Sequence, residues 1–147
     1  MDILKNNHID DFNHLLKSSS INYKYEKLWP TLNSVGYKEE DIQVIFAEKI
    51  LDEDNKLISF VFYLFYDEKI VTVTKDETET LRYNITEFAG PVVRKTISTT
   101  YRVENEKELT LILRDGKHFT WSTDNIFKYV EEYDSVSKMF TDIYKMY

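Results

Sequence analysis

The segment Leu57–Thr74, with the sequence LISFVFYLFYDEKIVTVT, carries the densest run of apolar residues in the chain and reads as a β-hairpin. Its β-branched and aromatic residues suit a pleated, packed surface. With a period of two, one face of the first strand carries Ile58, Phe60, Phe62, Leu64 and Tyr66, and the other carries Leu57, Ser59, Val61, Tyr63 and Phe65. Because both faces are mostly apolar, we predict a strand inside a sheet that has a core on one side and a covering element on the other.

Length and composition indicate a single soluble domain over residues 1–147, long enough to bury roughly two thirds of its unfolded surface. The chain has no Cys, which excludes disulfides, cysteine-based zinc sites and thiolate catalysis and is typical of a reducing compartment. The longest apolar run, about ten residues, is half of the ~20 that a membrane helix requires. Residues 1–7 lack the pattern of a secretory signal, so we expect a cytoplasmic protein.

The net charge limits the classes of partner. A formal charge of −7 and a pI near 5.0 argue against nucleic acid and against an anionic membrane, because both require a basic surface. With only 3 Gly and 2 Pro, the chain offers little material for a phosphate-binding loop or a flexible linker. The partners that remain are another protein, a second copy of the chain, or a small molecule.

Residues 1–40 are expected to form a helical cover. Apolar residues at helical spacing predict a short helix from about residue 8 to 18, formed around Ile9, Phe12, Leu15 and Leu16. A second helix is expected within residues 22–35, with Pro30 in its first turn and Gly36 in a left-handed conformation after its end.

Residues 41–121 are expected to form about seven antiparallel strands, near 42–51, 57–66, 69–75, 79–86, 92–103, 107–114 and 117–121. The first of these is ambiguous, because its apolar residues fit both a helix and a strand; its β-branched content favours a strand. The strand over 92–103 is expected to be half-exposed, with Val93, Ile97, Tyr101 and Val103 on the inner side.

The turn between the last two strands allows a sharper prediction. A two-residue Asp115-Gly116 turn would place Phe119 and Trp121 on the polar side of the hairpin. A three-residue loop 114–116, with Gly116 left-handed and bulged, instead pairs Leu111 with Phe119 and Leu109 with Trp121 on one apolar face. We therefore predict the bulged turn.

The C-terminal part of the chain is predicted to be one long helix over residues 124–146. Asp124 is suited to be its N-cap, and no Gly or Pro interrupts it. Its apolar stripe consists of Ile126, Val130, Tyr133, Phe140, Ile143 and Tyr147, which must pack against the sheet.

The order of seven strands and one helix resembles the pleckstrin-homology-like superfold over residues 41–147. This resemblance implies two antiparallel sheets in a partly open barrel, with the terminal helix at one end, and many such domains bind proteins. Lipid-binding members carry Lys and Arg in the loop between the first two strands, whereas this loop is Asp52-Glu53-Asp54-Asn55-Lys56. Phosphoinositide binding is therefore disfavoured.

The alternative architecture resembles the helix-grip fold of START-like lipid binders, in which a curved sheet and a long C-terminal helix enclose an apolar cavity. Such a cavity would lie between Phe60, Phe62, Leu64 and the inward face of residues 126–147. The strand that usually precedes the two small helices has no counterpart in residues 1–8.

No residue pattern favours an enzyme, a cofactor or a metal site. His8 and His14 do not have the three- or four-residue spacing of helical metal ligands. The loop at Asp52 lacks the Gly and the bidentate Glu of a calcium loop, and no Gly-x-Ser-x-Gly turn is present. We therefore predict a non-enzymatic module that binds a protein or associates with itself; the alternative is a helix-grip binder of an apolar small molecule.

Two surfaces are candidates for that interaction. The first is the outer row of the strand over 92–103, which is polar, β-prone and locally basic and consists of Arg94, Thr96, Ser98, Thr100 and Arg102. The second is the aromatic cluster Tyr23, Tyr25 and Trp29, which is also suited to cover the outer face of the 57–66 strand.

Overall fold

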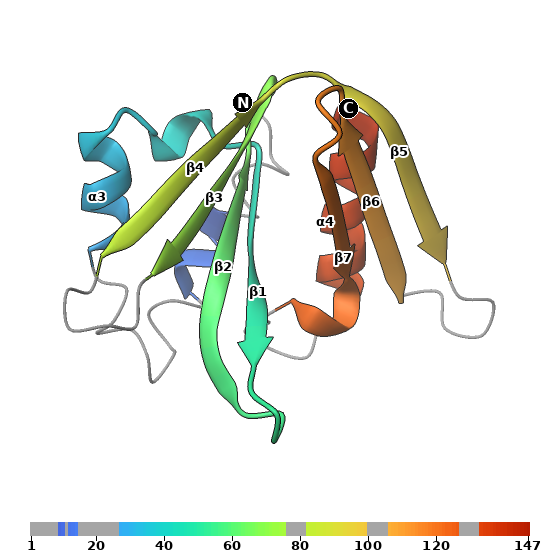
Figure 1. Ribbon diagram of the computed structural model, residues 1–147, viewed down its shortest axis with the longest axis horizontal. Coiled ribbons are helices and arrows are strands. Elements are labelled where there is room, and N and C mark those ends of the chain that lie inside the picture. Colours follow the sequence, from blue (N-terminus) through green and yellow to red (C-terminus); the bar gives the residue numbers. More distant parts are fainter. Residues whose placement is uncertain (1–8, 11, 15–26, 76–81, 100–105, 127–132) are drawn as a thin grey trace.

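The computed structural model describes residues 9–10, 12–14, 27–75, 82–99, 106–126 and 133–147 (Figure 1). The fold is α+β: a four-stranded antiparallel sheet and a three-stranded antiparallel sheet are accompanied by short N-terminal helical segments and a C-terminal helix. In the described part of the chain, no helix is both long enough and apolar enough to cross a membrane.

The four-stranded sheet, here sheet A, has the strand order β1-β2-β3-β4. Its strands are Val44–Leu51 (β1), Leu57–Phe65 (β2), Lys69–Lys75 (β3) and Tyr83–Ala89 (β4). The ambiguous segment near residues 42–51 is therefore a strand, as its β-branched content predicted. The central hairpin β2–β3 is also confirmed, and Leu64 pairs with Val71 at its centre.

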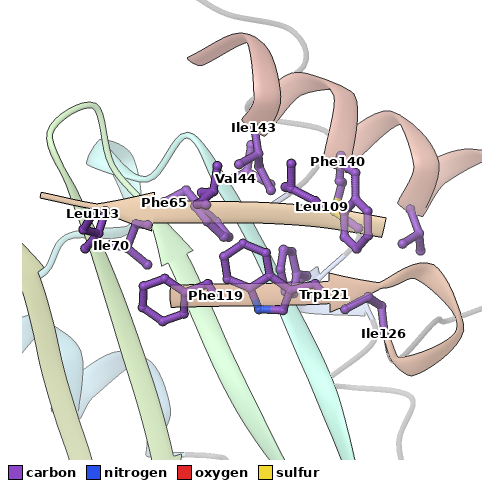
Figure 2. Packing of buried hydrophobic residues seen from close by; sticks show 14 residues of the cluster. Val44, Phe65, Ile70, Leu109, Leu113, Phe119, Trp121, Ile126, Phe140 and Ile143 are labelled. Carbon is purple, nitrogen blue, oxygen red and sulfur yellow. The ribbon is translucent and has the colours of Figure 1, made fainter. Parts of the chain in front are cut away.

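Sheet A is buried on both faces, as the apolar alternation of β2 predicted. The outer face contributes Ile45, Phe60, Phe62, Leu64 and Val71 to a cluster that Ile9, Phe12, Leu28 and Leu32 of the N-terminal segments cover. The inner face contributes Val44, Phe46, Phe65 and Ile70 to a second cluster, in which side chains of the other sheet and of the C-terminal helix also meet (Figure 2).

The two clusters bear on the alternative architecture. The helix-grip alternative would place a cavity between Phe60, Phe62, Leu64 and the inward face of the C-terminal segment. Phe60, Phe62 and Leu64 belong to the outer cluster, whereas Ile126, Phe140 and Ile143 belong to the inner one. Because side chains alternate along β2, these residues lie on opposite faces of sheet A and do not face a common space.

Helix α3 (Leu28–Ser34) confirms the second predicted helix. Pro30 lies in its first turn, where a missing N–H costs no hydrogen bond. Gly36 follows the helix with φ +95°. The amide of Gly36 donates to the Asn33 carbonyl at 3.2 Å and that of Tyr37 to the Leu32 carbonyl at 2.9 Å, which is the paired bonding of a left-handed helix end.

The three-stranded sheet, here sheet B, consists of Val92–Thr99 (β5), Lys107–Leu113 (β6) and His118–Ser122 (β7), in that order. The bulged turn between β6 and β7 is confirmed. Gly116 has φ +92°, and Leu109 pairs with Trp121 and Leu111 with Phe119. All four apolar residues are buried in the inner cluster, so the turn sets the register that completes the core.

Strand β5 departs from the predicted alternation at its start. The register with β6 shifts between Val92 and Arg94, so that Val92 pairs with Leu113 and Arg94 with Ile112. The intervening Val93 was expected on the inner side, but it is 56% exposed. A β-bulge redirects a side chain in this way, and Val92 takes the inner position instead.

The C-terminal helix is shorter than predicted. Helix α4 spans Tyr133–Met146. Asp124, the predicted N-cap of the long helix, lies instead in a separate 3₁₀ turn, Thr123–Asn125, whose own N-cap is Ser122. Ile126 is extended and forms an isolated antiparallel bridge with Glu48 of β1. Its apolar side chain still enters the inner cluster, which explains why it matched the helical spacing without being helical.

Candidate functional site

Strand β5 is an end strand of sheet B, and this edge is the candidate site. Arg94, Thr96 and Ser98 are exposed on β5, as the sequence predicted for the outer row. Thr100 and Arg102 of the same row lie outside the described residues, as do Tyr23 and Tyr25 of the aromatic cluster.

The hydrogen bonds around β6 determine which backbone groups of β5 face outward. The Leu113 amide donates to the Lys117 carbonyl at 2.9 Å, and the Lys107 amide donates to Thr123 Oγ1 at 3.2 Å. The backbone N–H and C=O groups of the odd-numbered residues of β6 therefore point toward β7. The Arg114 amide donates to the Pro91 carbonyl on the β5 side at 3.1 Å, which fits the same alternation. Bonded and non-bonded pairs alternate in an antiparallel ladder. The even-numbered residues of β6 therefore bond to β5.

The register then identifies the free edge of β5. Arg94, Thr96 and Ser98 are opposite even-numbered residues of β6, so their backbone groups are used inside the sheet. The N–H and C=O groups of Lys95, Ile97 and Thr99 point away from β6. These three residues form the β5 edge, which is available to an additional strand.

Helix α4 holds this edge in place from the inner side. Lys95 Nζ donates to the Tyr144 carbonyl at 2.8 Å and lies 4.5 Å from the centroid of the Tyr144 ring. Lys107 Nζ donates to Thr141 Oγ1 at 3.1 Å, and Ile97 packs against the inner cluster. A cation that bonds to a carbonyl in the last turn of a helix also interacts favourably with the helix dipole.

Hydroxyl groups lie on the outer face of sheet B beside the exposed row of β5. Thr110 and Thr120 are cross-strand partners whose hydroxyl oxygens are 3.1 Å apart, and Thr120 Oγ1 is 3.2 Å from His118 Nε2. His118 is exposed, as the bulged register predicted. The exposed row of β5 therefore borders a surface of hydroxyl groups rather than an apolar one.

Trp29 belongs to the cover of sheet A. Its ring is partly buried against the outer cluster, 6.2 Å from the Phe12 ring in an edge contact. Its indole N–H donates to Asn13 Oδ1 at 2.8 Å, and Asn13 Nδ2 donates to Glu39 Oε1 at 3.1 Å. These contacts make Trp29 part of the packing between the N-terminal segments.

A polar group that the sequence did not reveal lies beside the inner cluster. The Tyr63 hydroxyl donates to Glu48 Oε1 at 3.3 Å, and the Tyr63 ring packs edge-on against Trp121 with centroids 5.1 Å apart. Burial raises the pKa of Tyr63 to about 12, and the nearby Glu48 carboxylate adds to the shift. Burial also raises the pKa of Glu48, although the bond from Tyr63 opposes that shift.

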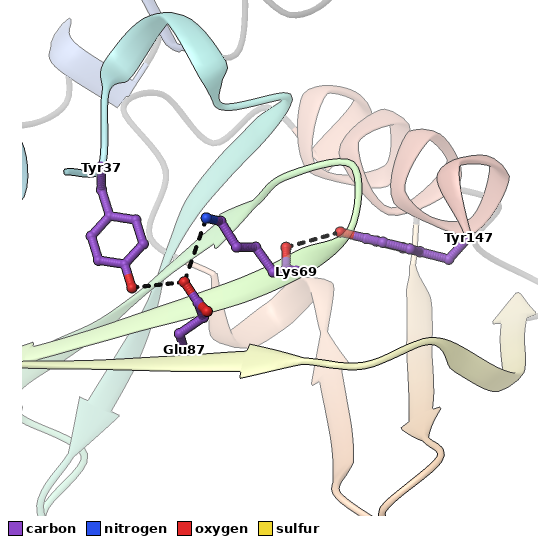
Figure 3. Close-up of polar contacts among 4 residues, drawn as sticks. All are labelled: Tyr37, Lys69, Glu87 and Tyr147. Atoms are coloured by element: carbon purple, nitrogen blue, oxygen red, sulfur yellow. Dashed lines mark hydrogen bonds and ion pairs between the residues drawn. The ribbon is translucent and has the colours of Figure 1, made fainter.

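A second polar group joins three distant parts of the chain (Figure 3). Glu87 Oε1 on β4 accepts from the Tyr37 hydroxyl at 2.9 Å and lies 3.4 Å from Lys69 Nζ. That ammonium is 5.3 Å from the centroid of the Tyr37 ring and 5.2 Å from that of the Tyr66 ring. Burial, followed by the charge of Asp41, raises the pKa of the Tyr66 hydroxyl above its usual range.

The β2–β3 turn, which Tyr66 and Lys69 flank, also accepts hydrogen bonds from the residue that follows α4. The Tyr147 hydroxyl donates to the Tyr66 carbonyl and, at 3.4 Å, to the Lys69 carbonyl. The β2–β3 turn is thereby tied to the N-terminal cover through Tyr37 and to the C-terminal helix through Tyr147. Since these partners come from separate elements, no local spacing in the sequence could have identified them.

Neither polar group has the donor set of a metal centre. Across the ranges of the chain that the structure describes, no group of three or more His, Asp or Glu side chains is placed to hold a metal ion. No family model, curated protein or solved structure matches this chain. The β5 edge is therefore the surface that supports a binding function.

Proposed function

We propose that this chain is a non-enzymatic protein-binding module of the pleckstrin-homology-like type that accepts an extended segment, from another protein or from a second copy, along the β5 edge. The four-plus-three division of the strands and the terminal helix packed on β5 and β6 support the assignment to this superfold. The single observation that carries the function is the outward direction of the backbone groups of Lys95, Ile97 and Thr99.

An added strand would gain backbone hydrogen bonds from these three residues, and its side chains would alternate between two environments. On the outer side they would meet the row Arg94, Thr96 and Ser98, and on the inner side they would meet Ile97 and Tyr144. Arg94 and Lys95 give this edge a positive charge in a chain of net charge −7, so a segment that contains carboxylates is favoured.

Amide hydrogen exchange tests the edge directly. In the protein alone we expect slow exchange at Thr96 and Ser98, whose amides bond to β6, and fast exchange at Lys95, Ile97 and Thr99. The probe is the capped peptide acetyl-Thr-Val-Glu-Val-Thr-Val-amide, and its control is the same peptide N-methylated at alternate residues to block strand pairing. Selective protection of the three outward amides by the first peptide alone would support the function. Equal exchange at all five amides in the free protein would refute it.

Two proline variants separate docking from folding. Thr99→Pro removes an outward N–H and is expected to leave the β5–β6 ladder intact while weakening binding of the probe peptide. Ser98→Pro removes an amide that bonds to β6 and is expected to lower the free energy of unfolding. The proposal fails if Thr99→Pro binds the probe peptide as tightly as the original chain.

A further inference from the structure

Large apolar side chains are exposed at three separated places on the described part of the molecule. Ile50, Leu51 and Leu57 are 39–41% exposed at the end of the β1–β2 hairpin. Val93, at the start of β5, is 56% exposed. Val35, after helix α3, is the remaining exposed large apolar residue among those described. Exposed apolar side chains that lie in a group next to charged residues are typical of an interaction surface.

The end of the β1–β2 hairpin is a rigid and acidic projection, here called the tip and formed by residues 50–57. Asp52 Oδ1 accepts the amides of Asp54 at 2.8 Å and Lys56 at 2.9 Å, and Asn55 is left-handed with φ +62°. Glu53 and Asp54 are exposed, and their carboxylates lie next to the apolar residues in sequence. Figure 1 shows the tip extending past the ends of the neighbouring strands. A tip fixed by its own hydrogen bonds loses little conformational entropy when it docks.

The start of β5 has the complementary chemistry. The bulge turns Val93 outward, and it is followed by the exposed Arg94 and by Lys95. The tip therefore offers apolar side chains together with three carboxylates and Lys56. The start of β5 offers Val93 with the exposed Arg94, whereas Lys95 Nζ is bonded to the Tyr144 carbonyl. Within one molecule the two surfaces lie apart, because the tip belongs to sheet A and β5 is the far strand of sheet B (Figure 1).

We propose that the tip of a second copy of this chain docks at the start of β5, on Val93 and the exposed Arg94 beside the β5 edge. Leu51 and Leu57 then pack against Val93, and Glu53 and Asp54 face Arg94. This inference rests on the proposed function, because it places the partner on the same strand, but it specifies the partner and the segment. The contact is head-to-tail, so a pair retains an unused tip on one copy and an unused β5 surface on the other, and association continues into a short chain or a ring.

The contact is expected to be weak. A hairpin tip covers less area than the interface of a standard stable complex, and a net charge of −7 on each copy opposes association. Salt screens both the local attraction and the overall repulsion, so the dependence on salt alone does not identify the contact. Variants matched in net charge are needed instead.

Sedimentation velocity over roughly 10 μM to 1 mM protein measures the association, because a contact of this kind corresponds to about −4 to −7 kcal/mol. We expect the average mass of the original chain to rise above 17.6 kDa with concentration. Glu53→Lys with Asp54→Lys in the tip, and Arg94→Glu on β5, are each expected to keep the chain monomeric. The matched control, Asp67→Lys with Glu68→Lys, makes the same charge change in the exposed β2–β3 turn and is expected to associate like the original chain or more strongly.

Mixing the two monomeric variants distinguishes head-to-tail contact from other arrangements. The tip variant keeps its edge and the Arg94→Glu variant keeps its tip, so together they are expected to form a one-to-one pair that does not grow further. Leu51→Ser, which leaves the charge unchanged, is expected to weaken association as well.

A chain that stays monomeric to about 1 mM would overturn this inference. So would association that the tip variant does not reduce, or an equal loss of association in the control. In those cases the exchange experiment on the three outward amides still decides the proposed function separately.

Discussion

Substitution of Gly116 by Ala is a direct test of the turn that sets the register of β7. Gly116 has φ +92°, and an added Cβ would meet no atom within 4 Å, so the whole cost comes from backbone conformation. A non-glycine residue in the left-handed region costs roughly 1–2 kcal/mol. For a chain of this length each kcal/mol corresponds to about 2–4 °C in Tm, which predicts a decrease of roughly 2–8 °C.

Gly90→Ala is the matched control, because a Cβ at Gly90 also meets no atom within 4 Å but its φ is not in the left-handed region. We expect this variant to be unchanged or more stable by up to about 1 kcal/mol, because Ala restricts the unfolded chain. Thermal unfolding followed by circular dichroism measures both variants. Equal effects at the two positions, or a stable Gly116→Ala, would refute the bulged turn as the element that fixes the Leu111–Phe119 pair.

Two further substitutions test the polar groups. Tyr147→Phe removes the hydroxyl that donates to the β2–β3 turn and is expected to lower the free energy of unfolding in urea by about 1 kcal/mol. Tyr144→Phe, three residues earlier in α4, is expected to change it less. For Glu48, burial raises the pKa in the folded state, so its ionisation costs stability as pH rises through that pKa. Glu48→Gln is therefore expected to gain stability relative to the original chain as pH rises above the ordinary Glu pKa of 4.5. A difference in the opposite direction would show that the bond from Tyr63 dominates.

The features predicted correctly from the sequence depend on neighbouring residues. The alternation in Leu57–Tyr66 indicated a sheet buried on both faces because the period of two is fixed by the strand itself. Gly36 and Gly116 were identified because each follows an apolar pattern at the point where a left-handed residue is required. In both cases the local backbone conformation is determined by residues within a few positions of the pattern that predicted it.

The errors arose where a distant partner decides the conformation. Ile126 has the spacing of a helix residue, yet it is extended because it bridges to Glu48 on β1. Val93 fits the alternation of its strand, but the bulge opposite β6 turns it outward. Glu48 contacts Tyr63, and Glu87 contacts Tyr37. Each of these contacts joins two separate elements, so no periodic pattern in the sequence predicts it.

Four strands lie at sheet edges, β1 and β4 in sheet A and β5 and β7 in sheet B. The edges of β4 and β5 differ in charge, which favours binding at β5 over β4. In sheet A the Tyr66 amide donates to the Lys69 carbonyl at 3.0 Å, and the register then directs the backbone groups of Ile85 and Glu87 outward from β4.

The Glu87 carboxylate next to this edge is paired with Lys69 Nζ at 3.4 Å, whereas the exposed Arg94 lies on the outer side of β5. An acidic strand is therefore favoured at β5, next to a cation, over β4, next to an ion pair. The amides of Ile85 and Glu87 serve as an internal control in the exchange experiment. If the acidic probe peptide protected them as strongly as those of Lys95 and Ile97, strand pairing without charge selection would be the mode of binding.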